Sequence, residues 1–286
     1  MGYAAPSLAA FDEARQRFNI QVIATYPNND AVASGRRLKR IGIAMSSTFD
    51  TFISGETVDL VVPDAQAIED YGWHAWFNDA DTTRYLEQGL YPNSREQQRH
   101  YLDGLNTPDG DRLATLIWSK SAETLVGTAS LSAISWQHRS AETAVVIGDR
   151  VGRVDDLFHG LEAKARLVEH AFEVMGLERV GGGQARPLAD WQRLQLLFGF
   201  RPEGIKRQAF RKGQKAYDSV LSGCTLADYR RVKKARDGNY WPGRQQLLAL
   251  MRTLPRDSVV DCVADAIEEA VSSYLAEVPL AVEDKT

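Results

Sequence analysis

Cysteine is scarce in this chain of 286 residues, which contains only Cys224 and Cys262. Two cysteines cannot build a disulfide framework or a four-cysteine metal site, and they fit a reducing compartment, so we expect both to be small core residues. No apolar run approaches the ~18 residues that a membrane-spanning helix needs. The N-terminus, Met-Gly-Tyr-Ala-Ala-Pro-Ser, lacks a basic region followed by an apolar core. These absences predict a cytoplasmic protein without a membrane partner.

The chain also lacks an excess of basic residues and the common catalytic fingerprints. Its 34 Lys and Arg against 38 Asp and Glu give a net charge of −4, so we expect no nucleic-acid partner. There is no P-loop, no Rossmann glycine fingerprint and no Ser-His-Asp order. His159 and His170 have no partner at metal-ligand spacing, so we expect no metal site.

What the sequence does contain is a strand, a glycine turn and a helix in succession between residues 141 and 175. Thr143-Ala-Val-Val-Ile147 is typical of a buried strand. The segment from Gly148 to Val154 follows with two glycines and two arginines, which free the backbone and can face an anion. A helical stripe comes next, formed by Leu157, Leu161, Val168, Phe172 and Met175. Because the first N–H groups of a helix lack partners, this order predicts a candidate phosphate site.

The rest of the pattern predicts a mixed chain of helices and strands. Helices are expected over residues 7–18, 64–77, 82–86, 94–105, 187–199, 245–253 and 258–275. Strands are expected over residues 20–25, 58–62, 112–119, 125–131, 178–185, 204–211 and 215–222. The last helix carries an apolar stripe that includes Cys262, Ile267 and Val271, and it packs either on its own domain or on a second copy as a homodimer.

Several separated motifs agree with one known family. They are Trp76-Phe-Asn-Asp79, Thr83-Arg-Tyr-Leu86, Glu142 before the central strand, Leu161-Glu-Ala163, Leu196-Leu-Phe-Gly-Phe200, Glu203-Gly204, Arg207-Gln-Ala-Phe-Arg-Lys-Gly213 and Tyr217-Asp218. Together they resemble the GNAT (Gcn5-related) N-acetyltransferase superfamily, in its ribosomal-protein and nucleotide-aminosugar acetylating branch, over about residues 57 to 229. The resemblance implies an α/β (α+β) fold with a mixed, mostly antiparallel sheet that splays between the family's fourth and fifth strands. It also implies three parts: an N-terminal extension (1–55), the acetyltransferase-like domain (56–229) and a helical C-terminal extension (230–286).

The same resemblance implies acetyl-CoA as co-substrate and gives it a place. The pantetheine arm would pair with the strand at Thr143–Gly148, and the pyrophosphate would rest on the turn after it. The residues implied in coenzyme binding are Val145, Val146, Ile147, Gly148, Arg150, Gly152, Arg153, Gly160 and Gln195.

Two departures from the family pattern make this coenzyme loop degenerate. The turn around Arg150 and Gly152 is a slipped version of the family's, and Asp155 and Asp156 follow it. Either Asp155 caps the helix and occupies the pyrophosphate position, or the helix starts near Gly160 and both aspartates face solvent. The second departure is Gln195, which stands where the family often has a tyrosine that protonates the leaving thiolate.

The candidate catalytic residues are Glu142 as base at the strand end, His138 as an alternative base, and Tyr217 on the last strand. Glu142 and His138 also have a purely structural interpretation, as a solvated carboxylate and a loop histidine. Candidate acceptor-binding residues are Trp76, Asn78, Asp79 and Asp218, of which Trp76 can equally be core and Asp218 can satisfy backbone donors.

We therefore expect an acetyl-CoA-dependent N-acyltransferase that acts by direct attack of a primary amine on the thioester. An amino sugar nucleotide is the first acceptor expected, and a protein N-terminus or a small amine the second. Two alternatives stay open: a binding or assembly module that has kept the fold without activity, and transfer of a different acyl group.

Overall fold

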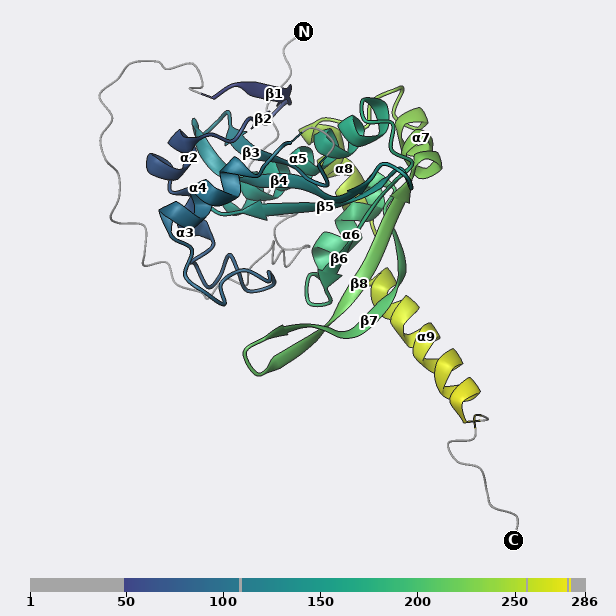
Figure 1. Cartoon of the computed structure of the whole chain (residues 1–286). Coiled ribbons are helices and arrows are strands. Elements are labelled where there is room, and N and C mark those ends of the chain that lie inside the picture. Colours follow the sequence, from purple (N-terminus) through teal and green to yellow (C-terminus); the bar gives the residue numbers. More distant parts are fainter. Residues whose placement is uncertain (1–48, 108–109, 256, 277, 279–286) are drawn as a thin grey trace.

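The computed structural model describes residues 49–107, 110–255, 257–276 and 278 (Figure 1). The helix expected over residues 7–18 and the strand expected over 20–25 lie outside this part of the chain. No helix of the described residues is long and apolar enough to cross a membrane.

One sheet organises the described chain. Its order is β1-β2-β3-β4-β5-β6-β8-β7, and every neighbouring pair is antiparallel except β5 and β6. The strands are β1 (Thr51–Ser54), β2 (Val58–Val61), β3 (Leu113–Ser119), β4 (Thr124–Ser135), β5 (Ser140–Ile147), β6 (Arg179–Ala185), β7 (Arg201–Lys212) and β8 (Lys215–Thr225). This confirms the expected mixed, mostly antiparallel sheet.

The helices cover both faces of the sheet and so produce two hydrophobic cores. The short helices α2 (Ala65–Glu69), α3 (Trp73–Trp76) and α4 (Arg95–Asp103) lie together on one face, over a cluster that includes Ile68, Trp73, Leu116 and Trp118. The larger core contains α5 (Arg153–Glu173), α6 (Ala189–Gln195) with the 3₁₀ turn η1 (Leu196–Phe198), α7 (Leu226–Lys234) and α8 (Arg244–Thr253). Figure 1 shows the β7–β8 hairpin and α9 (Val259–Leu275) extending away from this body.

Several expectations about local structure need correction. The helix expected over 64–77 is two helices, because Gly72 adopts a left-handed conformation (φ 68°) between them. Residues 82–86 form turns and not a helix. Cys224 is buried as expected but Cys262 is exposed, since α9 buries only Val260 and Ala264 and leaves most of its apolar stripe in solvent.

The sheet splays between β5 and β6, as the resemblance implies. Their parallel pairing covers only Ser140–Glu142 and Arg179–Gly181, whereas β5 continues to Ile147 and β6 to Ala185. Along this further length β5 is hydrogen-bonded on one side only, to β4. The side that faces β6 is therefore an open strand edge inside the sheet.

Candidate coenzyme and acceptor site

The gap between β5 and β6 ends at a turn that a tryptophan supports. Gly148 follows β5, and a Cβ atom there would lie 2.3 Å from the ring of Trp76. Trp76 is buried in α3, so it fixes the path of the chain as it leaves the gap. The structure thus brings Gly148 and Trp76 together in a packing contact.

The helix after this turn begins with its own internal anion. α5 starts at Arg153, directly after Gly152, so the expectation that it starts near Gly160 is wrong. Asp156 folds back on the turn: its Oδ1 accepts the N–H of Val151 at 3.0 Å and that of Gly152 at 3.4 Å. Only 4% of Asp156 is exposed, and burial raises the pKa of its carboxyl to about 6.

Asp155, which we considered as the helix cap, takes a different role. Its Oδ1 pairs with Nη2 of Arg244 at 2.8 Å, and the Arg244 guanidinium also lies 4.8 Å from the ring centre of Phe158. The neighbouring Arg150 acts on Asp156 and lowers the pKa that burial raises. The turn therefore has the backbone and cations of an anion site, but two of its N–H groups are bound to Asp156.

Gly160 lies well inside α5 and not in the turn. A Cβ atom there would lie 3.6 Å from Trp191 and 3.7 Å from Val145, so this glycine brings the helix close to β5. Val145 is half-buried, and Val146 and Ile147 are buried on alternate faces of β5. These residues form one wall of the gap.

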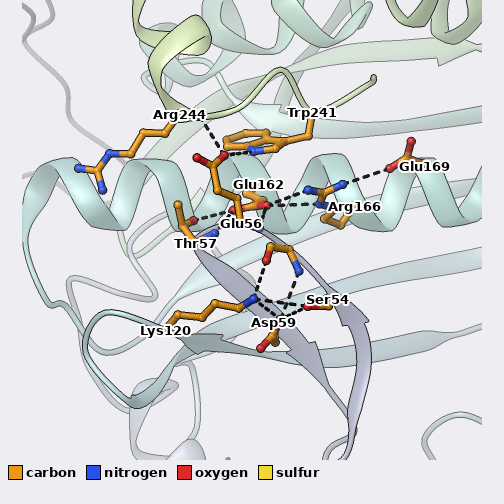
Figure 2. Close-up of polar contacts among 11 residues, drawn as sticks. Ser54, Glu56, Thr57, Asp59, Lys120, Glu162, Arg166, Glu169, Trp241 and Arg244 are labelled. Atoms are coloured by element: carbon orange, nitrogen blue, oxygen red, sulfur yellow. Dashed lines mark hydrogen bonds and ion pairs between the residues drawn. The ribbon is translucent and has the colours of Figure 1, made fainter. Parts of the chain in front are cut away.

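A buried carboxylate that the sequence analysis did not single out holds α5 to the start of the sheet (Figure 2). Glu162 is fully buried and accepts the N–H groups of Glu56 and Thr57, the Thr57 hydroxyl and Arg166. Glu56 in turn accepts Trp241 Nε1 at 2.8 Å and the N–H of Arg244 at 3.0 Å. A glutamate in a helical stripe looks like an ordinary surface residue in sequence, since its partners lie over a hundred residues earlier.

Of the candidate catalytic residues, Glu142 lies where the gap closes. It is exposed, and it forms the last pair with Gly181 of β6 while also pairing with Ser132 of β4. Tyr217 of β8 packs edge-on against Tyr85 at 5.6 Å between ring centres. His138 is exposed in the turn between β4 and β5, where its N–H binds Ser135 Oγ. Glu142 is thus the candidate nearest the closed end of the gap along β5.

The candidate acceptor residues have structural partners of their own. Asn78 exchanges two hydrogen bonds with the backbone of Asn93, and Asp79 accepts the N–H of Thr82 at 2.6 Å. Asp218 accepts the N–H of Gln208 and pairs with Arg186 at 3.7 Å. Because side chains alternate along β8, Asp218 and Tyr217 lie on opposite faces of it. These contacts support the loop and the hairpin beside the gap.

A cavity of about 420 Å³ lies on the same side as α3 and α4. Its aromatic lining is Trp73, Phe77, Tyr91 and Tyr101, and its charged lining is Glu87 and Arg112. Thr128 of β4 forms part of it and pairs with Val146 of β5, so the cavity lies over the strands next to the gap. Lys212 of the β7–β8 hairpin donates to the backbone carbonyls of Leu86 and of Gln88, which lines the cavity.

Gln195 takes part in a buried polar chain under the gap. Its Oε1 accepts Lys164 Nζ, and its Nε2 donates to Gln184 Oε1 at 2.6 Å. Lys164 was not among the expected site residues, because in sequence it is one of many lysines on a long helix. In the described part of the chain, no group of three or more His, Cys, Asp or Glu residues could hold a metal ion.

Comparison with known protein families gives a match to part of the chain. Residues 60–185, from β2 through β6, match the family model of the acetyltransferase (GNAT) domain. No curated protein sequence matches the chain.

Solved structures share the fold at low sequence identity. A GCN5-related N-acetyltransferase from Brucella melitensis is 21% identical, with 71% of this chain and 94% of that one covered and a TM-score of 0.54. Spermidine N-acetyltransferase from Vibrio cholerae, in complex with CoA and spermine, is 17% identical, with 61% and 98% covered and a TM-score of 0.51. RimJ from Mycobacterium smegmatis, in complex with CoA-disulfide, is 16% identical, with 62% and 88% covered and a TM-score of 0.52. At these identities the likeness shows the fold.

Proposed function

We propose that this protein is an N-acyltransferase that moves the acetyl group of acetyl-CoA to a primary amine by direct attack. The observation that carries the proposal is the gap between β5 and β6, which is closed at Glu142 and leads to the helix N-terminus at Gly152. An open strand edge can pair with the pantetheine arm, and the helix start can receive the pyrophosphate. The residues beside the gap therefore fit this coenzyme, with Asp156 as the one group that opposes it.

The chemistry assigned to this site needs a base, a polarised carbonyl and an ordered approach. The amine nitrogen attacks the thioester carbon, the new C–N bond forms, and the sulfur leaves with the electron pair of the broken C–S bond. Glu142 takes the proton of the amine directly or through water, and the β5 backbone near Val145 and Val146 polarises the carbonyl. We assign Tyr217 to the acceptor side and keep His138 as the alternative base.

We further propose an amino sugar nucleotide as the acceptor, with a protein N-terminus or another small amine as the alternative. The face of the hairpin that carries Tyr217 also carries Lys206, Lys212 and Lys215, by the pairing of β7 with β8. These cations attract phosphate and repel a polyamine. The cavity with Arg112 and its aromatic rings has the size and lining of a small-molecule site.

One observation favours the second candidate function, a coenzyme-free binding module. The Asp156 carboxylate already binds the N–H groups of Val151 and Gly152. A homodimer through α9 fits either function, because Ile267, Val271, Tyr274 and Leu275 are exposed along this helix. Sedimentation equilibrium with and without α9 tests the dimer, which is excluded if both forms are monomers.

The deciding experiment couples calorimetry with a thiol-release assay. Wild-type protein is titrated with acetyl-CoA and then assayed with amino sugar nucleotides, spermidine and a peptide. We expect binding, and turnover that Glu142→Gln reduces by about 10² or more in kcat without changing acetyl-CoA affinity. The matched control, Glu269→Gln on the exposed surface of α9, should keep full activity. Absence of binding at millimolar acetyl-CoA and low salt would leave only the binding module.

A further inference from the structure

The polar chain Lys164–Gln195–Gln184 has a charge at its inner end that nothing neutralises. Lys164 is 5% exposed and Gln195 is 1% exposed. The Lys164 ammonium lies 4.0 Å from the ring centre of Phe200 and donates to Gln195 Oε1. Among the described residues no carboxylate forms an ion pair with it. A buried charge held only by a neutral amide is costly, so its retention needs a reason.

The ammonium fixes the direction of every hydrogen bond in the chain. An ammonium group only donates, so the Gln195 atom that meets it must be the carbonyl oxygen. The Gln195 atom that meets Gln184 is then the amide nitrogen, which only donates, and the Gln184 atom that receives it must again be oxygen. The protonated Lys164 therefore sets the orientation of both side-chain amides. The free end of Gln184 is therefore an NH₂ group.

Gln184 lies on β6, beyond the point where the pairing with β5 ends. The last strand pair is Glu142 with Gly181, so Gln184 is three residues further and would be level with Val145 if the pairing continued. Three residues along a strand span about 10 Å. Gln184 is half-buried, and no described residue accepts a hydrogen bond from its Nε2.

We propose that Gln184 binds an amide carbonyl of the pantetheine arm, and that Lys164 and Gln195 are positioning residues that hold it as a donor. The inference rests on the proposed function, because it takes an acyl-coenzyme as the ligand of the gap. With the thioester near Glu142 and the pyrophosphate near Gly152, the middle of the arm lies level with Gln184. The Gln184 NH₂ group at the end of the chain needs a hydrogen-bond acceptor, and the amide carbonyls of the pantetheine arm are acceptors.

The charge state of Lys164 makes this arrangement sensitive to pH. Burial lowers the pKa of Lys164 to about 7. The Cys224 thiol is the titratable neighbour that would raise the pKa of Lys164 if it ionised, and it stays neutral because burial raises its own pKa to about 12. Gln195, Trp191 and Phe200, the other groups around the ammonium, do not titrate. Above neutral pH the Lys164 amine becomes neutral, and it no longer fixes the donor and acceptor directions of the hydrogen bonds through Gln195 and Gln184.

Isothermal titration with two ligands tests the inference. Acetyl-CoA carries the arm, whereas adenosine 3′,5′-bisphosphate carries only the nucleotide end. We expect Gln184→Leu and Lys164→Met each to weaken acetyl-CoA binding about tenfold and to leave bisphosphate binding unchanged. The double variant should lose no more than either single variant, because both act on one hydrogen bond.

The pH dependence gives a second readout that a purely structural role would not change. Between pH 6 and 8, the affinity ratio of acetyl-CoA to the bisphosphate should fall for the wild type relative to the same ratio for Lys164→Met. The change that remains in Lys164→Met measures the titration of Asp156 and of the terminal 5′-phosphate, which only the bisphosphate carries and whose second pKa is about 6. Gln184 lies on a half-exposed strand position, so its variant serves even if Lys164→Met fails to fold.

The outcomes separate this inference from the proposed function. A wild-type protein that binds neither ligand overturns both. A wild-type protein that binds both ligands, with an unchanged affinity ratio in Gln184→Leu, overturns the inference alone. Equal weakening of the two ligands also overturns it, because the chain would then only support the fold.

Discussion

Asp156 is the buried acid in the first turn of α5, and its charge depends on pH near neutrality. Its pKa is about 6 in the folded protein and near 3.8 in a free carboxyl group, so the folded state keeps the proton to higher pH. The contribution of Asp156 to the unfolding free energy should therefore be fully present below pH 4 and fall by about 3 kcal/mol as the pH rises through 6. Urea unfolding of the wild type and of Asp156→Asn across this pH range checks the prediction. The fall in unfolding free energy that Asp156 causes should be present in the wild type and absent from the variant.

The same variant should bind acetyl-CoA more tightly at pH 7. Removing a carboxylate that lies near the pyrophosphate relieves a repulsion of about 1 to 4 kcal/mol, which corresponds to fivefold or more in affinity. The side-chain amide oxygen that the substitution introduces can still accept the two N–H groups of the turn. Equal affinities for the two proteins would mean that the pyrophosphate does not bind at this helix start.

At the scale of elements, the end of β5 depends on its contact with α3. Gly148→Ala places a methyl group 2.3 Å from ring atoms of Trp76, and this buried ring has no room to move. We expect a loss of about 1–3 kcal/mol in unfolding free energy, with weaker coenzyme binding. Gly204→Ala on β7 is the matched control, because a Cβ atom there meets nothing within 4 Å. Urea denaturation of both variants checks the prediction, and equal midpoints would contradict it.

The elements with a strong periodic pattern could be predicted from sequence, and the contacts between them could not. Alternation and helical stripes found all strands from β2 to β8, although β4, β5, β7 and β8 are longer than expected. The helix break at Gly72 was not predicted, because apolar residues continue on both sides of it. At the site, the pattern located the turn and the two aspartates that follow it. It did not predict which aspartate accepts the N–H groups of the turn. A shift of one residue in the helix start changes which carboxylate faces the free N–H groups.

The buried hydrogen-bond partners of the site could not be predicted from the sequence, for another reason. Lys164, Gln184 and Glu162 meet their partners only after folding, and a lysine or glutamate on a helix gives no sign of burial in a single sequence. Gln195 was found only as a departure from the family pattern. The boundaries at residues 55 and 229 stay predictions.

For the whole molecule, the residues after α7 belong to the main core. Tyr240, Trp241, Leu247, Leu248 and Met251 are buried in the same cluster as α5. A chain that ends at Asn239 should therefore fail to fold cooperatively, whereas a chain that ends at Pro255 and lacks α9 should lose little stability. Thermal unfolding and circular dichroism of the two truncations measure this. A stable, cooperative shorter form would show that the core does not need α8.

The hydrogen bonds of Glu56 and the ion pair of Asp155 can form only after their partners have been synthesised. Their partners, Trp241 and Arg244, follow the last strand in the chain, so they leave the ribosome after α5 and every strand of the sheet. In a nascent chain that already contains every strand, Asp155 in the first turn of α5 still lacks its ion-pair partner Arg244. The contacts that support the start of α5 are therefore complete only after residues 241–244, which follow the last strand, have been made.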